Sequence, residues 1–137
     1  MKAALLIVFS VSLVSCGNEF TKVMKSHDAE FKLRMAEQYY VKKSYNRAQQ
    51  LFEDVMPYFK TSKEFEDLYY KYAYCAWYQE DYLNAENLFK SYLEIFPNSA
   101  RAEEIDFMHA KCFYEQSPKP ELDQTNTIKA MGMMQTF

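Results

Sequence analysis

The feature that most constrains this chain is an internal repeat with a period of 37 residues. Ala36, Ala73 and Ala110 fall in register, and the first two are each followed twelve positions later by a second alanine, Ala48 or Ala85. Self-similarity at a fixed period of roughly 20 to 50 residues is typical of stacked copies of one supersecondary unit. The sequence therefore predicts an array of repeated units.

The repeated unit is expected to be a pair of antiparallel helices. Only two glycines occur in 137 residues, and tight β-hairpin turns use glycine more readily than any other residue. Two helices can approach closely at the paired alanines, while the larger Leu51, Phe52, Leu88 and Phe89 fill the space beside them. We expect an all-α fold.

This pattern resembles the tetratricopeptide repeat. Its small eighth and twentieth residues match Ala36 and Ala48, its aromatic twenty-fourth residue matches Phe52, and its terminal proline matches Pro97. The period exceeds the family's, which is about 34 residues, and we place the additional residues around 60–64. The resemblance implies a helical-hairpin superhelix of about two and a half repeats, at about 28–62, 64–99 and 101–137.

The third repeat is interrupted and ends on an apolar face. A polar stretch with two prolines, from Ser117 to Thr127, cannot continue a helix. If Ala130 is the next packing alanine, this loop holds eight extra residues. Beyond the loop, an apolar stripe recurs every three residues and needs a cover: Ile128, Met131, Met134 and Phe137. We expect either that the chain is a fragment of a longer array or that a partner covers this end.

The first residues have the features of an export signal. Lys2 precedes an apolar run over residues 3–14, which is shorter than the roughly 20 residues that span a bilayer. Residues 13–16, ending at Cys16, resemble the lipobox of bacterial lipoproteins, which implies a signal peptide at 1–15 and a lipidated linker at 16–27. Diacylglycerol on the Cys16 thiol, with acylation of the new amine by a chain such as palmitate, would hold the protein on the membrane. The alternatives are an odd cysteine after a general secretory signal and a short N-terminal anchor.

The helix expected at about 66–79 carries aromatic side chains on two sides. Its packing side is satisfied by Tyr69, Tyr72, Ala73 and Ala76, so its other side must cover something beyond its own hairpin. In the tetratricopeptide family that side lines the concave groove, and Tyr and Trp suit binding surfaces. The predicted protein-binding groove, with the equivalent positions of the flanking units, consists of Leu33, Tyr40, Tyr70, Tyr74, Trp77, Tyr78, Phe107 and Tyr114. Alternatively, a neighbouring loop, residues 18–26 or further repeats cover these rings.

No motif for catalysis, cofactor binding or metal binding is evident, so we do not expect an enzyme. Neither His27 nor His109 has a second ligand at a metal-binding spacing. The carboxylates at 64, 66, 67, 103 and 104 lie near expected helix starts, where the helix dipole favours them. Cys75 and Cys112 occupy equivalent positions of successive repeats, a geometry that favours separate, partly buried thiols. A net charge of −3 argues against nucleic acid as a partner.

A lipobox followed by tetratricopeptide hairpins resembles the BamD family, the lipoproteins of the outer-membrane β-barrel assembly machinery. The paired glutamates after Pro97 and the insertion SPKPELDQTNT resemble the Bacteroides-type version, of which this chain would be an N-terminal fragment. The resemblance implies a non-enzymatic scaffold, lipid-anchored at the periplasmic face of the outer membrane, that binds unfolded outer membrane proteins and the barrel-forming subunit. Two alternatives are an adaptor for cell-envelope or peptidoglycan enzymes and a surface lipoprotein that captures a nutrient polymer.

Overall fold

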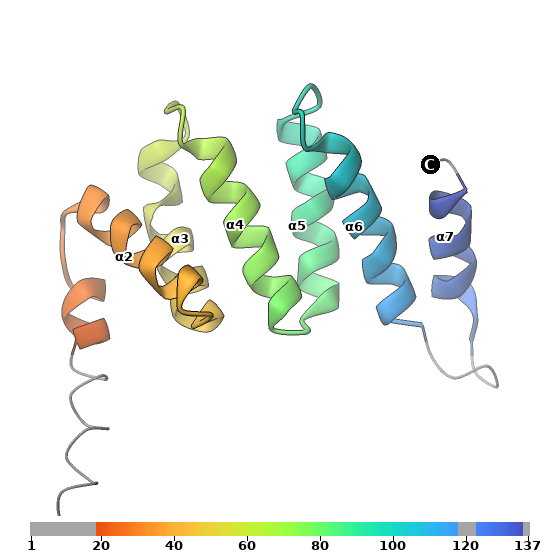
Figure 1. The fold of residues 1–137 in the computed structure, drawn as a ribbon, viewed down its shortest axis with the longest axis horizontal. Coiled ribbons are helices and arrows are strands. Elements are labelled where there is room, and N and C mark those ends of the chain that lie inside the picture. The colour runs from red at the N-terminus through yellow and green to blue at the C-terminus, as the bar shows by residue number, and fades with distance from the viewer. Residues whose placement is uncertain (1–18, 118–122, 136–137) are drawn as a thin grey trace, which may run out of the picture.

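The computed structural model describes residues 19–117 and 123–135. All regular secondary structure within these residues is helical. After a short helical segment at 19–24 come α2 (Ala29–Val41), α3 (Tyr45–Phe59), α4 (Phe65–Tyr78), α5 (Tyr82–Ile95), α6 (Ala102–Glu115) and α7 (Thr125–Met134). Successive helices pack against each other in chain order and form the row seen in Figure 1. The prediction of an all-α, tetratricopeptide-type array of helical hairpins is confirmed.

The two helices of each hairpin meet at alanines, as the repeat predicts. We call α2, α4 and α6 the A helices and α3, α5 and α7, which follow them, the B helices. The alanines that recur with the repeat are all buried: Ala36, Ala73 and Ala110 on the A helices, and Ala48, Ala85 and Ala130 on the B helices. A methyl side chain favours the helix and still lets two backbones approach closely. Ala130 is therefore the third packing alanine of a B helix, and the additional residues of the third unit lie between α6 and α7.

Large side chains fill the space beside the alanines. Leu51, Phe52 and Phe89 are fully buried, whereas Leu88 is only partly buried. One core cluster lies around α2 and α3, and a second lies around α4, α5 and the buried side of α6. Partly buried side chains such as Tyr40 and Met56 pack against both clusters, so the array has a continuous interior.

Part of the segment assigned to the linker packs against the first hairpin. Residues 19–24 are helical, Val23 is buried in the first core cluster, and the ring of Phe20 lies 5.6 Å from that of Tyr39. This segment covers the apolar edge of α2 that the first hairpin leaves open. The proposed lipid site at Cys16, like the signal peptide at 1–15, lies outside the described residues.

Helix α7 exposes apolar side chains. Ile128 and Met131 are exposed, whereas Ala130 is the buried residue by which α7 packs. Phe137, the last member of the predicted stripe, lies outside the described residues. Among the helices that the structure describes, none has both the length and the apolar character needed to cross a membrane.

The turn from A helix to B helix places a non-glycine residue in the left-handed region. Lys43 and Glu80, which are 37 residues apart, have φ angles of 59° and 61°. The amide that follows each donates back to the last turn of the A helix, from Ser44 to the Tyr39 carbonyl at 2.8 Å and from Asp81 to the Ala76 carbonyl at 3.1 Å. This is the helix-ending geometry that glycine normally occupies, so both residues carry a steric cost.

We expect Lys43→Gly and Glu80→Gly each to stabilise the protein by about 0.5–1 kcal/mol. Glycine removes the steric cost of the left-handed conformation, and the greater conformational entropy that it gives the unfolded chain offsets only part of this gain. Urea unfolding followed by circular dichroism measures the effect. Lys42→Gly is the matched control, since Lys42 has a φ of −75° and should lose stability on the same change. Equal losses at Lys42 and Lys43 would contradict the interpretation.

Glu66, at the start of α4, is hydrogen-bonded to the end of α5 and to the loop that follows α5. Its Oε1 accepts hydrogen bonds from the Tyr92 hydroxyl at 2.8 Å and from the Ser99 hydroxyl at 2.6 Å. The hydrogen bond from Ser99, followed by that from Tyr92, lowers the pKa of Glu66 below its ordinary value of 4.5. The carboxylate form is therefore favoured in the folded protein.

A lowered pKa makes the contribution of Glu66 to stability depend on pH. That contribution is present above the ordinary value of 4.5 and is lost as the pH falls through the lower folded pKa. We expect the melting temperature of Glu66→Gln to fall less steeply than that of the parent between pH 5 and pH 3. Glu94→Gln, an exposed change on α5, is the control and should retain the parent's steepness. Equal steepness in Glu66→Gln and the parent would refute this assignment.

Candidate protein-binding surface

The eight side chains predicted to line a groove all lie on A helices, but they are not equally accessible. Tyr78, Phe107 and Tyr114 are 47%, 44% and 60% exposed. The side chains of Tyr40, Tyr70 and Trp77 are half-buried. Leu33 and Tyr74 are only 8% and 7% exposed, so these two belong to the core. The accessible aromatic surface is therefore smaller than the predicted groove.

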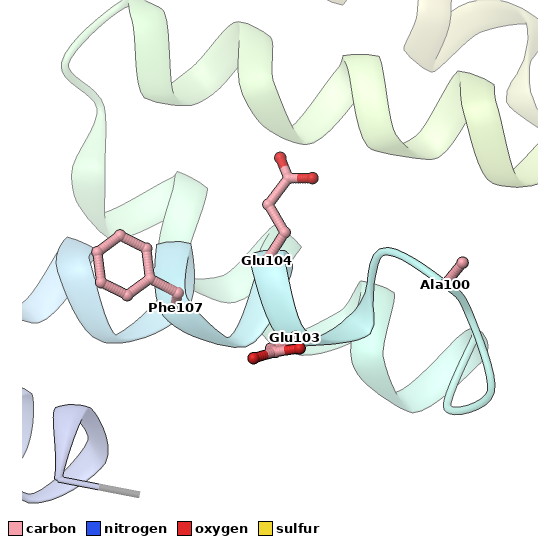
Figure 2. A pocket seen from close by; sticks show the side chains of 4 residues that line it. All are labelled: Ala100, Glu103, Glu104 and Phe107. Carbon is pink, nitrogen blue, oxygen red and sulfur yellow. The ribbon is translucent and has the colours of Figure 1, made fainter. Parts of the chain in front are cut away.

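Tyr74 is covered because its hydroxyl and its ring both have partners inside the array. Its ring lies 4.6 Å from that of Tyr70 and 5.3 Å from that of Phe89. The hydroxyls of Tyr70 and Tyr74 both donate to the same carboxylate oxygen of Glu104, with a distance of 2.7 Å from Tyr70. Figure 2 shows the Glu104 side chain directed away from α6 toward the neighbouring helix. Glu104 thus joins α6 to α4.

Burial keeps these tyrosine hydroxyls protonated. Desolvation, followed by the hydrogen bond to Glu104, raises the pKa of Tyr70 to about 12. The same two causes, in the same order, raise the pKa of Tyr74 further above its usual value. Both phenols therefore act as hydrogen-bond donors at any physiological pH, and their polar ends are used within the array.

Trp77 is shared between two hairpins. Its ring lies 5.1 Å from that of Tyr82 on α5, and the Lys111 ammonium of α6 lies 5.0 Å from the ring centroid. A cation over an indole face is attracted by the ring quadrupole. Trp77 therefore helps to hold α6 in place, and only part of its surface is open to a partner.

Tyr78 lies in an aromatic cluster where the first A helix and the second A helix end, and its ring is 5.8 Å from that of Tyr74. Its ring stacks on that of Tyr45, the first residue of α3, with centroids 4.5 Å apart. The Tyr40 ring lies edge-on to the Tyr78 ring, with centroids 6.4 Å apart. The accessible rings thus form two groups, one around Tyr78 and another on α6 at Phe107 and Tyr114.

Polar contacts between successive units were not found from the sequence. Lys71 pairs with Glu37 at 2.8 Å, and Arg101 pairs with Asp67 at 3.0 Å. These pairs, like Tyr70 and Glu104, join residues that are 34 positions apart. Opposite charges recurring at that separation were the signal that could have revealed them.

The contacts with Lys71 and Arg101 lower the pKa of Asp67. Burial raises the pKa of Asp67, but hydrogen bonds and charges from Lys71 and Arg101 outweigh it, so the pKa lies below the ordinary value. The Arg101 guanidinium also lies 4.4 Å from the centroid of the Tyr70 ring. Arg101 therefore contacts a carboxylate and an aromatic face of α4 together.

The remaining candidate residues have structural surroundings. Cys75 and Cys112 are separate, fully buried thiols, and burial raises the pKa of both to about 12, which leaves them unreactive. His109 joins α6 to α5 through a 3.0 Å contact with Glu86. Within residues 19–117 and 123–135, no three His, Cys, Asp or Glu side chains are grouped to hold a metal ion.

Beside the exposed Phe107 lies an open hollow of about 440 Å³ on α6. It is lined by Ala100, which precedes the helix, and by Glu103, Glu104 and Phe107 of α6. In Figure 2 the side chains of Glu103 and Glu104 point in different directions. The carboxylates at 103 and 104 lie in the first turn of α6, as expected from the sequence. The hollow combines negative charge with an aromatic face.

Comparison with known proteins assigns the chain to a family. No curated protein gives a significant match. A family model for YfiO, described as an outer membrane lipoprotein, matches residues 27–137, which include every helix from α2 to α7. The helical-hairpin array with its partly exposed aromatic side chains therefore belongs to the YfiO family of outer membrane lipoproteins.

Proposed function

We propose that this outer membrane lipoprotein is a non-enzymatic scaffold in the assembly of outer-membrane β-barrel proteins, a BamD-like role. Its A helices would bind unfolded barrel proteins, and the barrel-forming subunit of the assembly machinery would be a second partner. The family match over residues 27–137 supports the role in outer membrane assembly. The resemblance of residues 117–127 to Bacteroides-type proteins stays a prediction.

The exposed rings of α6 carry the binding part of this proposal. Phe107 and Tyr114 are seven residues apart, so they lie on one side of the helix two turns apart. Lys111 lies between them on α6, and Glu103 and Glu104 lie at the helix start. Strands of outer-membrane barrels alternate apolar and polar side chains and carry aromatic girdles. An extended strand of this kind can place its apolar and aromatic side chains on the rings of α6 and its polar ones beside the charges.

Photocrosslinking in living cells tests the proposal. A photoreactive amino acid at Tyr114 should trap unfolded outer membrane proteins, because this ring is the most exposed of the predicted groove. The same amino acid at Tyr58, which is exposed on α3, is the matched control and should trap few of them. Capture of peptidoglycan enzymes or of glycan at Tyr114 would instead support one of the two alternative functions.

Alanine at Phe107 and at Tyr114 should each weaken binding of an unfolded barrel protein by about five- to thirtyfold, the effect of removing a ring that contributes 1–2 kcal/mol. Fluorescence anisotropy with a labelled, urea-denatured barrel protein measures the affinity after dilution. Tyr58→Ala should leave the affinity unchanged. Tyr74→Ala is unsuited to this purpose because Tyr74 is buried, and its loss would destabilise the array. Unchanged affinity in both α6 variants would refute the assignment of the surface.

The lipid anchor is tested separately. We expect Cys16→Ala to move the protein from the membrane fraction to the soluble fraction, because the variant cannot carry the acyl chains that hold it on a bilayer. Cell fractionation with detection of the protein measures the change. Cys75→Ala, which alters a buried thiol, is the control and should stay with the membrane. Retention of the Cys16 variant in the membrane fraction would contradict attachment at this residue.

A further inference from the structure

A second hollow, of about 510 Å³, is lined by side chains of three successive helices. Helix α6 packs against both α5 and α7 and lies between them in the row (Figure 1), so it forms the base of this hollow. The lining includes Glu86 and Lys90 of α5, His109 and Phe113 of α6, and Lys129 and Gly132 of α7.

This hollow lies on the opposite side of α6 from the rings proposed to bind unfolded barrel proteins. His109 follows Phe107 by two residues, and an α-helix turns by about 100° per residue, so the two side chains project about 200° apart. His109 lines the hollow, whereas Phe107 is exposed on the other side. The two surfaces are therefore separate.

The hollow opens on the side of α7 that faces back toward α5. Glu86 is the residue by which α5 contacts the following A helix, and Met131 is its counterpart on α7, counting from the packing alanines of the two helices. Lys129 is two residues from Met131 and so projects from the opposite side of α7. A further helix that packed on α7 at Met131 would leave the hollow open.

The positive charges of the hollow have no carboxylate partner. The one carboxylate in its lining, that of Glu86, is engaged by the His109 ring at 3.0 Å. The Lys129 ammonium lies 5.4 Å from the centroid of the Phe113 ring. Among the residues that the structure describes, none forms an ion pair with Lys90 or Lys129. Two ammonium groups are thus available to an anionic partner.

Gly132 is the second feature that points to a partner. It lies inside α7, where a glycine costs stability relative to alanine because it gives the unfolded chain more freedom. A Cβ added at Gly132 would meet no atom within 4 Å, so packing among the described residues does not require a glycine here. Glycine also lets another molecule approach a backbone closely, and Gly132 borders the hollow.

We infer that the hollow between α5 and α7 is a docking site for an acidic segment of a partner protein. Its carboxylates would lie between Lys90 and Lys129, and its backbone would approach α7 at Gly132. Ammonium groups form charge-assisted hydrogen bonds with carboxylates, and the Phe113 ring offers an apolar contact to a side chain beside them. The inference goes beyond the proposed assembly role and does not require it.

Complementary charge selects the acidic partner. Residues 63–137 contain thirteen aspartates and glutamates against seven lysines and arginines, so most of the surface around the hollow repels an acidic segment. Such a segment is attracted where the ammonium groups of Lys90 and Lys129 are not neutralised.

A pair of synthetic peptides tests the site. One has four glutamates around a central phenylalanine, and the other has glutamines in place of the glutamates. Titration into the isotope-labelled protein, followed by nuclear magnetic resonance, measures both the affinity and the place of binding. We expect the acidic peptide to shift the amide signals of residues 129–133 and to bind at least about tenfold more tightly than the neutral one. Its affinity should fall as salt is raised, since exposed charges are screened.

Lysine variants assign the charge to the hollow. Lys90→Gln and Lys129→Gln should each weaken binding of the acidic peptide about two- to fivefold, the effect of losing one exposed ion pair. Lys63→Gln removes the same charge from an exposed lysine between α3 and α4 and is the matched control. It should leave the affinity nearly unchanged, because it lies outside the hollow.

Gly132→Gln tests the close approach to α7. Because the space beside Gly132 is open, this variant should keep or raise the melting temperature. Its side chain would occupy the hollow and weaken binding of the acidic peptide at least about fivefold. Asn87→Gln, at the corresponding position of α5, is the control and should leave binding unchanged. A variant that is equally or more stable but binds more weakly separates a docking role from a structural one.

Four results would overturn the inference. They are equal binding of the acidic and neutral peptides, equal effects of Lys63→Gln and Lys129→Gln, and unchanged binding in Gly132→Gln. The fourth is inorganic phosphate shifting the same amide signals as strongly as the acidic peptide, which would indicate a site for a free anion.

Self-association of the protein that Lys129→Gln abolishes would also contradict it, since the occupant would then be a second copy of this chain. Loss of peptide binding in Lys129→Gln, with binding of unfolded barrel proteins retained, would support the inference independently of the proposed function.

Discussion

The array depends on the close approach of two helices at paired alanines. Each A helix and the B helix that follows it meet at fully or almost fully buried methyl groups, as Ala36 and Ala48 do in the first hairpin. A larger side chain at either position would push the helices apart and open the space that Phe52 fills. Because each hairpin buries its apolar side only against its neighbours, this contact propagates along the row of helices.

Polar side chains then fix how one hairpin follows the next. Glu104 accepts from two tyrosine hydroxyls of α4, Arg101 holds Asp67, and Lys71 holds Glu37. These contacts occupy groups that would otherwise be available to a partner. The aromatic richness of α4 is therefore partly structural, and the rings left for binding lie mainly on α6 and at the end of α4.

The internal repeat also allows the starts of two A helices to be compared. The start of α4 shows two carboxylates and a ring satisfied by the residues that lead into the next helix. At the start of α6 the corresponding carboxylate, Glu104, accepts instead from Tyr70 and Tyr74 of the preceding A helix.

The sequence by itself determined the helical hairpins, their alanine contacts and the position of the insertion before α7. These features follow from local periodicity, which fixes the side of a helix on which each residue lies. Only the tertiary structure decided that Leu33 and Tyr74 are buried, that residues 19–24 cover the first hairpin, and that Glu104 joins α6 to α4. Periodicity identifies a second aromatic side on α4 but not what packs against it. That depends on side chains some 30 residues away, whose approach is set by the packing angle between hairpins.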